Sequence, residues 1–323
     1  MRNTIGATLA AALILAATPC HAQKVFQVAA LIAEDQFTAA YEGFRSKMSE
    51  LGYVAGKNIR YELYNAKGDM VALESLAQKI VQQKPDLIVT SSTTASVPMA
   101  KLTAGTNLPV VFLTSGNPLK MVKSYSSSGN NLTGVSTSVM ELTEKRLELF
   151  RQIAPRVKRL IFITDSKSPN YQEYVAATQE AAQRLGFALS EIEIKAANGD
   201  EVKKQLGRLT RKSGEGVFIP PDTALVSAAE FIAGEAIKEK LPAVGSNVQT
   251  VRRGLLAVYS ADYYALGQQG AKLADKILHG ARPEDLPIEL PNKLELIVNL
   301  KTARAIGLKI PKEILLRADE LIE

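Results

Sequence analysis

The sequence predicts an α/β protein made of two doubly wound parallel-sheet lobes. Short β-branched runs alternate with helical stretches along most of the chain, and the whole alternation occurs twice. Strands that alternate with helices favour parallel sheets covered on both faces. The 323 residues are also enough for two lobes of roughly 130–150 residues each.

An internal repeat supports the two-lobe prediction. KVFQVAALIAEDQ in the first half is similar to KRLIFITDSKSPN in the second, and NIRYELYNAKGD is similar to LSEIEIKAANGD. Landmarks recur at nearly constant offsets: Leu51-Gly52-Tyr53 against Leu185-Gly186-Phe187, Gly68-Asp69 against Gly199-Asp200, and Thr94-Ala95 against Thr223-Ala224. Each half is therefore expected to have the same order of elements.

The elements of each half follow from these patterns. Gly52 and Gly186 lie where helices are expected to end, because glycine adopts the left-handed conformation of a helix C-terminus at little cost. Asp69 and Asp200 are interpreted as N-caps of the next helices, which assigns them to the fold rather than to a site. The predicted strands are Val25–Ile32, Ile59–Tyr64, Leu87–Thr90, Val110–Leu113, Leu160–Thr164, Leu189–Ile194, Val217–Ile219 and Ala243–Gly245.

Residues 1–22 have the order of a secretory signal peptide. Arg2 precedes an apolar core, and small residues lead to a predicted cleavage site after Ala22. That core is too short to span a membrane, which takes about 20 residues. The only cysteine, Cys20, leaves open a lipoprotein, but Pro19 is unusual before a lipidated cysteine. We expect a periplasmic or otherwise extracytoplasmic protein that needs no disulfide.

The composition argues against nucleic-acid binding and against catalysis. The net charge of +6 comes from 39 basic and 33 acidic residues without long runs of one sign, which indicates a solvated surface. After Ala22 only His279 remains, too few histidines for a His-based triad or a zinc site. GxSxG, SxxK and GxxxxGK[ST] motifs are absent, and Gly-Glu-Gly at 214–216 precedes a strand instead of following one. We expect no cofactor, no metal and no enzymatic activity.

The stretch AVYSADYYALGQQGAKLADKILHG, residues 257–280, is a strand that runs into a helix. Apolar residues at helical spacing predict a helix from about Tyr263 to His279 that packs on the first lobe. Asp262 has two interpretations: an N-cap, which contributes about 1 kcal/mol, or an acceptor for the ammonium group of a ligand. Tyr263 and Tyr264 are adjacent in a helix, so at most one of them is expected to face a ligand.

A ligand cleft is predicted between the two lobes. Parallel sheets bind ligands outside the carboxyl ends of their strands. The loops that follow the predicted strands are rich in polar residues, and several begin a helix whose free N–H groups suit a carboxylate or phosphate. The candidate ligand-binding residues are Phe37, Thr93, Thr94, Ser115, Asn117, Asp165, Ser168, Asn170, Asp222, Thr223, Ser246, Asn247, Asp262 and Tyr263.

Several segments match the pattern of a known family. They are ELGYVAGKNIRYELYNAKGD (50–69), KPDLIVTSSTTAS (84–96), LPVVFLTSGNPLK (108–120), NNLTGVS (130–136), KRLELFRQIAPRVKRL (145–160), residues 254–289 and LELIVNLKTARAIGLKIP (294–311). With these segments, the chain resembles the ABC-transporter substrate-binding proteins of the tryptophan/tyrosine-binding type along nearly its whole length after residue 22. It departs from the family at Asn117, where the family's "DP" loop has Asp.

The resemblance implies a type I periplasmic-binding fold, in which the chain crosses between the lobes three times. We place the crossings near Gly134–Ser138, Tyr259–Asp262 and Leu286–Pro291, with lobe 1 at 23–136 plus 262–287 and lobe 2 at 137–261 plus 288–323. Such a protein closes its lobes around a small ligand and delivers it to an ABC permease in the membrane. Aromatic amino acids are the favoured ligands, and other amino acids and purine-like compounds remain open. We also expect a monomer that does not bind nucleic acid.

Two other functions remain as alternatives. A ligand-sensing module for a signalling receptor would use the same cleft and differ only in its docking partner. An exported hydrolase would need a catalytic pair, and nothing in the sequence separates such a pair from ordinary hydrogen-bonding carboxylates.

Overall fold

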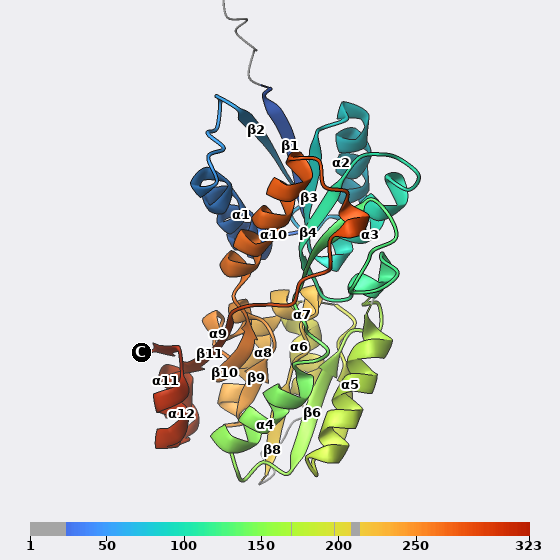
Figure 1. Ribbon diagram of the computed structural model, residues 1–323. Coiled ribbons are helices and arrows are strands. Elements are labelled where there is room, and N and C mark those ends of the chain that lie inside the picture. The colour runs from blue at the N-terminus through green and yellow to red at the C-terminus, as the bar shows by residue number, and fades with distance from the viewer. Residues whose placement is uncertain (1–23, 169, 197, 208–213) are drawn as a thin grey trace, which may run out of the picture.

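The computed structural model describes residues 24–323 except 169, 197 and 208–213, and it has two lobes that each contain one sheet (Figure 1). The predicted signal peptide, Cys20 and the cleavage site after Ala22 lie outside the described residues. None of the helices in the described part of the chain has both the length and the hydrophobicity that a bilayer crossing needs.

The first lobe contains a five-stranded parallel sheet. Its strands are β1 (Phe26–Ile32), β2 (Ile59–Asn65), β3 (Leu87–Ser91), β4 (Val110–Ser115) and β5 (Leu132–Ser136). They are arranged in the order β2-β1-β3-β4-β5, and every pair is parallel. All five carboxyl ends therefore point toward the same edge of the sheet.

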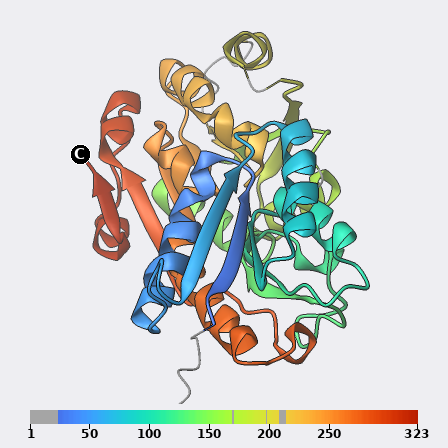
Figure 2. The ribbon, with the colours of Figure 1, turned by 90° about the horizontal axis from the view of Figure 1, so that it is seen from above.

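Helices cover both faces of this sheet (Figure 2). They are α1 (Thr38–Glu50), α2 (Met70–Gln83), α3 (Thr93–Leu102) and α10 (Tyr263–Leu278), with short 3-10 turns η1 (Asp35–Phe37), η2 (Pro118–Lys120) and η3 (Pro283–Asp285). Because side chains alternate along a strand, Val28 and Ala30 pack with α1 and α10, whereas Ala29 and Leu31 pack with α2 and α3.

The predicted return of α10 to the first lobe is confirmed. It packs closely on α1, and two glycines permit the approach. A Cβ at Gly267 would lie 1.8 Å from the carbonyl oxygen of Ala40, and a Cβ at Gly43 would lie 2.0 Å from that of Tyr264. The two backbones are therefore in direct contact.

The second lobe contains a seven-stranded sheet in the order β12-β11-β10-β9-β8-β6-β7. The strands are β6 (Arg159–Thr164), β7 (Ala188–Glu193), β8 (Glu215–Phe218), β9 (Ala243–Gly245), β10 (Ala257–Ala261), β11 (Leu294–Asn299) and β12 (Glu320–Ile322). The sheet is not purely parallel, because β11 pairs with β10 in the antiparallel direction. This reversal follows from the third crossing, which brings the chain back from the first lobe before β11.

The helices of the second lobe are α4 (Thr143–Ile153), α5 (Tyr171–Arg184), α6 (Gly199–Leu206), α7 (Thr223–Ser227), α8 (Ala229–Lys238), α9 (Val248–Arg252), α11 (Leu300–Ile306) and α12 (Lys312–Arg317). Leu160 and Phe162 of β6 belong to the core under α4 and α5. Ile161 and Ile163 face the opposite core, with α6 and α8.

Most predicted element ends agree with the structure. All eight predicted strands are present within two residues of the expected ends, a difference typical of strand boundaries. Gly52 and Gly186 follow α1 and α5 with positive φ angles of 95° and 69°. The Asp69 carboxylate accepts hydrogen bonds from the N–H groups of Val71 and Ala72, as expected for a cap.

The predicted N-cap at Asp200 is wrong. Asn198 caps α6 by accepting a hydrogen bond from the N–H of Glu201, and Asp200 lies in the first turn. The helix begins at Gly199, which is earlier than a cap at Asp200 would allow. Asn198, two residues before Asp200, therefore satisfies a free N–H group at the start of α6 in place of Asp200.

The chain passes from the first sheet to the second after β5, returns after β10 and passes again before β11 (Figure 1). The first and third connections lie side by side: Ser136 N–H donates to Glu289 O (2.8 Å) and Glu289 N–H donates to Gly134 O (2.9 Å). These connections lie beside the carboxyl ends of the first sheet, next to the cavity described below.

Candidate ligand-binding site

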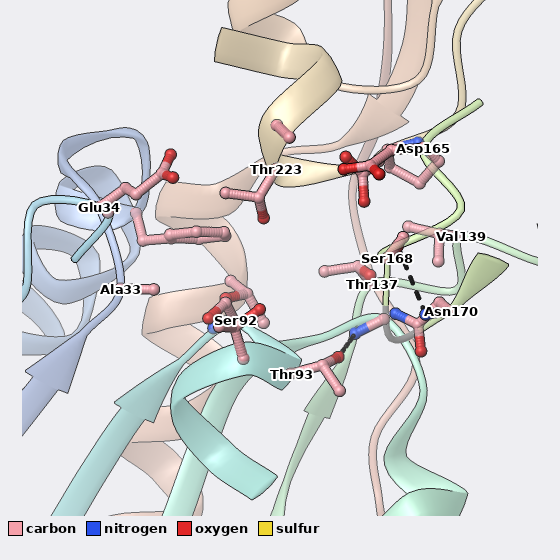
Figure 3. A pocket seen from close by; sticks show the side chains of 18 of the residues that line it. Ala33, Glu34, Ser92, Thr93, Thr137, Val139, Asp165, Ser168, Asn170 and Thr223 are labelled. Carbon is pink, nitrogen blue, oxygen red and sulfur yellow. Dashed lines mark hydrogen bonds between the residues drawn. The ribbon is translucent and has the colours of Figure 1, made fainter. Parts of the chain in front are cut away.

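A cavity of about 340 Å³ lies between the two lobes (Figure 3). It is lined by loops after the strands of the first sheet, by the loops after β6 and β8, and by the start of α10. Nine of the predicted residues line it: Phe37, Thr93, Thr94, Asp165, Ser168, Asn170, Asp222, Thr223 and Tyr263. The sequence predicted a cleft at the carboxyl ends of the strands, and most of the residues chosen on that basis line the cavity.

Hydroxyl groups and the N-terminus of α3 form one side of the cavity. Ser92, the N-cap of α3, has a positive φ of 84° that a non-glycine residue rarely adopts. Its Oγ accepts from Ala95 N–H (3.1 Å), and its own N–H donates to Thr114 Oγ1 (2.9 Å). Thr93 Oγ1 accepts from Gly116 N–H (2.9 Å). These bonds hold the positive end of α3 against the cavity, where a carboxylate is favoured.

Carboxylates form another side of the cavity. Figure 3 shows Glu34 and Asp165 on opposite sides of the space, with Thr223 between them. Asp222 also lines the cavity, is only 5% exposed and caps α7 through the N–H of Leu225 (3.1 Å). Among the described lining residues, the one cationic side chain is Lys167, and it is exposed.

The electrostatics of this side favour a cationic group. Burial raises the pKa of Asp222, and a hydrogen bond with Ser168 opposes the rise. Burial likewise raises the pKa of Glu34, opposed by a hydrogen bond from Gln36 (2.7 Å). The negative charge of Asp165 adds to the rise at Asp222, and that of Asp222 adds to the rise in the pKa of Glu34. A ligand ammonium would stabilise the ionised carboxylates through charge-assisted hydrogen bonds.

An aromatic pair supplies the apolar wall. The rings of Phe37 and Tyr263 stack at 5.8 Å between centroids with an angle of 8° between their planes. The hydroxyl of Tyr263 accepts a hydrogen bond from Asn247 Nδ2 (2.9 Å), which fixes the ring. Leu73 extends the apolar surface. Tyr264 is 40% exposed and does not line this cavity, as expected for the neighbour of Tyr263 in a helix.

Four of the predicted residues, all amides or hydroxyls, lie outside the cavity. Ser115 is fully buried, with its hydroxyl 3.3 Å from that of Thr93, and Ser246 Oγ donates to Ile219 O (2.8 Å). Asn117 Nδ2 donates to Glu173 (3.1 Å), and Asn247 Nδ2 donates to Tyr263. Each side chain is turned toward a protein partner, so these residues support the lining instead of forming it.

Asp262 also lies outside the cavity. Its carboxylate accepts from Ala265 N–H (3.2 Å), which caps α10, and from Lys293 Nζ (2.7 Å). Burial alone would raise the pKa of Asp262, but the hydrogen bonds from Lys293 and Ala265 outweigh it and lower the pKa. The geometry therefore matches the capping interpretation.

Asp262→Ala is expected to lower the free energy of unfolding by about 1 kcal/mol at neutral pH, because it removes the cap. Since the pKa of Asp262 is lowered, this difference should shrink as the pH falls through that pKa. Ligand affinity should stay within about threefold, a change of less than 1 kcal/mol. Urea unfolding and calorimetry test both points, with Asp262→Asn as the control that keeps a capping side chain. A large loss of affinity at unchanged stability would contradict this account.

Several lining residues were missed by the sequence interpretation. Glu34 and Thr137 lie just after β1 and β5, so their positions in the chain resemble those of the residues that were chosen. Asp69 was assigned to the fold alone, yet it both caps α2 and lines the cavity. Tyr174 reaches the cavity from the first turn of α5, and its hydroxyl donates to Pro221 O (3.3 Å). No local pattern distinguishes that tyrosine from a core residue.

The described residues contain no cluster of three or more His, Cys, Asp or Glu side chains arranged to hold a metal ion. The carboxylates of the cavity come from separate loops of the two lobes and face the space between them. The arrangement is that of a binding cavity with an acidic side, a hydroxyl-rich side and an aromatic wall.

Known proteins share this architecture. A curated "Tyrosine-binding protein" of Clostridioides difficile is 27% identical over 289 residues, which are 89% of this chain and 82% of that protein. A ligand-free, open substrate-binding protein with adhesive properties from Clostridium difficile has a TM-score of 0.74 and 26% identity, over 92% of this chain and 99% of that one.

A structure of an ABC domain in complex with L-Trp, from Streptococcus pneumonia, has a TM-score of 0.83 and covers 93% of this chain and 100% of that one. Its sequence identity is 23%, so it shows a common fold. The family model described as "ABC transporter substrate binding protein" matches residues 25–322. The chain therefore belongs to the ABC transporter substrate-binding proteins, a non-enzymatic class that binds small ligands outside the cytoplasm and works with ABC permeases.

Proposed function

We propose that this protein binds an aromatic amino acid between its lobes and delivers it to an ABC permease. The observation that carries the proposal is the cavity itself, in which an acidic side, a helix N-terminus and a stacked aromatic pair face one space. The names of its relatives point the same way: one is a tyrosine-binding protein, and another was solved with L-Trp.

The three surfaces of the cavity match the three groups of such a ligand. The ammonium would lie against Asp222 and Glu34, since the described lining holds no buried cation; the charge of Arg253, outside the lining, opposes the rise in the pKa of Glu34. The carboxylate would accept hydrogen bonds at the N-terminus of α3, near Ser92 and Thr93. The ring would pack on Phe37 and Tyr263, since aromatic pairs add stabilisation beyond their buried area.

The remaining features of the proposal come from the sequence. The chain would be exported through a signal peptide cleaved after Ala22 and would act as a monomer. Its lobes would comprise 23–136 plus 262–287 and 137–261 plus 288–323, so that ligand capture closes a hinge at the three connections.

A thermal-shift screen tests the proposed ligand class. The panel holds the twenty amino acids, aromatic acids, nucleobases, sugars and short peptides. A ligand at 100 times its dissociation constant adds about 2.7 kcal/mol to the stability of the folded state. We expect the largest shifts from L-tryptophan and L-tyrosine and none from aromatic acids that lack an ammonium. A shift confined to sugars or nucleobases would contradict the proposal.

A further inference from the structure

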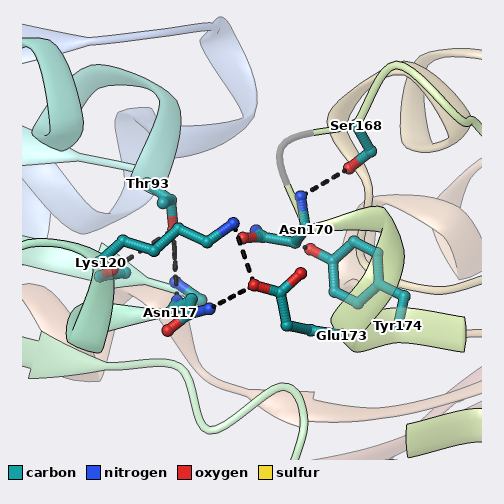
Figure 4. Close-up of polar contacts among 9 residues, drawn as sticks. Thr93, Asn117, Lys120, Ser168, Asn170, Glu173 and Tyr174 are labelled. Atoms are coloured by element: carbon teal, nitrogen blue, oxygen red, sulfur yellow. Dashed lines mark hydrogen bonds and ion pairs between the residues drawn. The ribbon is translucent and has the colours of Figure 1, made fainter. Parts of the chain in front are cut away.

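One of the contacts between the lobes beside the cavity is made by a carboxylate of the second lobe. Glu173, in the first turn of α5, accepts a hydrogen bond from Asn117 Nδ2 (3.1 Å) and forms an ion pair with Lys120 Nζ (3.1 Å). Figure 4 shows the two donors approaching Glu173 from the loop and turn after β4, across the space between the lobes. The side chains of Lys120 and Glu173 are 29% and 36% exposed, so water reaches the contact only in part.

Each end of this contact is joined to the cavity. On the first lobe, the N–H of Asn117 donates to Thr93 Oγ1 (3.4 Å), and Thr93 lines the cavity. Pro118 follows directly and restricts the turn that carries Lys120. On the second lobe, Glu173 lies one helical turn after Asn170, the lining residue that precedes α5. A change in the separation of the lobes therefore moves the contact and the cavity walls together.

We propose that Glu173, Asn117 and Lys120 form a latch that holds the lobes closed and sets how long a ligand is retained. The inference rests on the proposed function only for the identity of the trapped molecule, an amino acid. The contact between the lobes depends on the protein's own residues and not on the ligand. Exposed ion pairs contribute up to about 1 kcal/mol, and hydrogen bonds to charged groups contribute more when they are partly buried. The latch therefore favours the closed arrangement of the lobes, but its contacts are weak enough to break when the lobes open.

The residue at position 117 decides whether the latch forms. An amide can donate to Glu173, whereas a carboxylate would place two negative charges about 3 Å apart. The Asn117 amide therefore complements the carboxylate on the opposite lobe. Glu173 and Asn117 are positioning residues: they act on lobe closure and do not line the cavity.

The test compares Asn117→Asp, Glu173→Ala and the double variant Asn117→Asp/Glu173→Gln. L-Tryptophan is the probe, because the chain contains no tryptophan and light that indole absorbs but the ten tyrosines do not excites the ligand alone. Glu180→Ala is the matched control: Glu180 lies on the same helix, is 64% exposed and pairs within its own lobe, with Arg184. Dissociation rates are measured by chasing the bound ligand with excess L-tyrosine.

We expect the dissociation rate to rise about tenfold or more for Asn117→Asp and about three- to tenfold for Glu173→Ala. The double variant should return to within about threefold of the unmodified protein, since the introduced glutamine amide can donate to the introduced carboxylate. Glu180→Ala should change nothing. Rates for Asn117→Asp and Glu173→Ala equal to that of Glu180→Ala, or a double variant as fast as Asn117→Asp, would overturn the latch.

A second measurement needs no ligand. Spin labels at Lys101→Cys on α3 and Gln183→Cys on α5, both exposed positions, report the distance between the lobes in a Cys20→Ser background. The latch predicts a longer mean distance in Asn117→Asp and recovery in the double variant, at unchanged melting temperature. Identical distance distributions would reject the latch. If L-tryptophan fails to bind but the distances change, the proposed ligand is wrong and the latch stands.

Discussion

Asp222→Asn is expected to weaken L-tryptophan binding by about 10- to 100-fold, the equivalent of about 1.5–3 kcal/mol for a hydrogen bond to a charged group. Asp222 is 5% exposed and lines the cavity, and in the proposed binding mode it accepts from the ligand ammonium. The substitution removes its charge but preserves the shape of the side chain. Asparagine also caps helices as well as aspartate does, so α7 should remain intact. Fluorescence titration with L-tryptophan measures the change.

Asp69→Asn is the matched control for this prediction. Asp69 is also an aspartate that caps a helix and lines the same cavity, but it is exposed to water. Solvent screening should keep its effect on affinity within about threefold. Equal effects of the two substitutions would show that the ammonium does not lie at Asp222.

The same variant has a predicted effect on stability. Burial raises the pKa of Asp222 above its usual 3.8, so the folded protein holds this proton more tightly than the unfolded chain. The stability that this proton contributes is complete below pH 3.8 and is lost as the pH rises through the raised pKa. As the pH rises through that range in the absence of ligand, the free energy of unfolding of Asp222→Asn should therefore increase relative to that of the unmodified protein. Denaturant unfolding at several pH values measures this difference.

Gly267→Ala is expected to destabilise the protein by about 3 kcal/mol or more, at or above the usual range for an overpacked core. The new Cβ would lie 1.8 Å from Ala40 O and 2.8 Å from Phe44 N, and backbone atoms cannot turn away as a side chain can. The helices α1 and α10 must separate, which opens the core between them. The midpoint and slope of denaturant unfolding measure the loss.

Gly234→Ala is the control for this second prediction. Gly234 lies within α8, and a Cβ there would meet no atom within 4 Å. Alanine should stabilise that helix by about 0.5–1 kcal/mol, because glycine is the poorer helix former. A Gly267→Ala variant within about 0.5 kcal/mol of the unmodified protein would contradict the contact between α1 and α10.

The sequence was sufficient for the order of elements but not for every boundary or direction. The predicted strands were recovered because β-branched runs between helical stretches are a local signal that burial reinforces. Asp200 was predicted as a cap, whereas Asn198 caps α6, because the start of the helix depends on where the preceding loop ends. The antiparallel direction of β11 depends on the third crossing, a feature of the whole fold.

The site was predicted in part for a similar reason. Parallel strands bring their following loops to one edge, which placed Thr93, Asp165 and Asp222 in the cavity. The direction of a side chain within a loop depends on its partners. Asn117 turns to Glu173 and Asp262 turns to Lys293, and neither partner is close in the sequence. These longer-range contacts became visible only in the structure.

Titration with L-tryptophan and with indole-3-propionate, which lacks only the ammonium, tests the central claim most directly. The claim is that the cavity holds an amino acid with its ammonium against Asp222 and Glu34 and its ring on Phe37 and Tyr263. The account predicts saturable binding of L-tryptophan and at least about 100-fold weaker binding of indole-3-propionate, since buried carboxylates repel an anion that brings no cation. Equal affinities for the two compounds, or binding of neither, would contradict it.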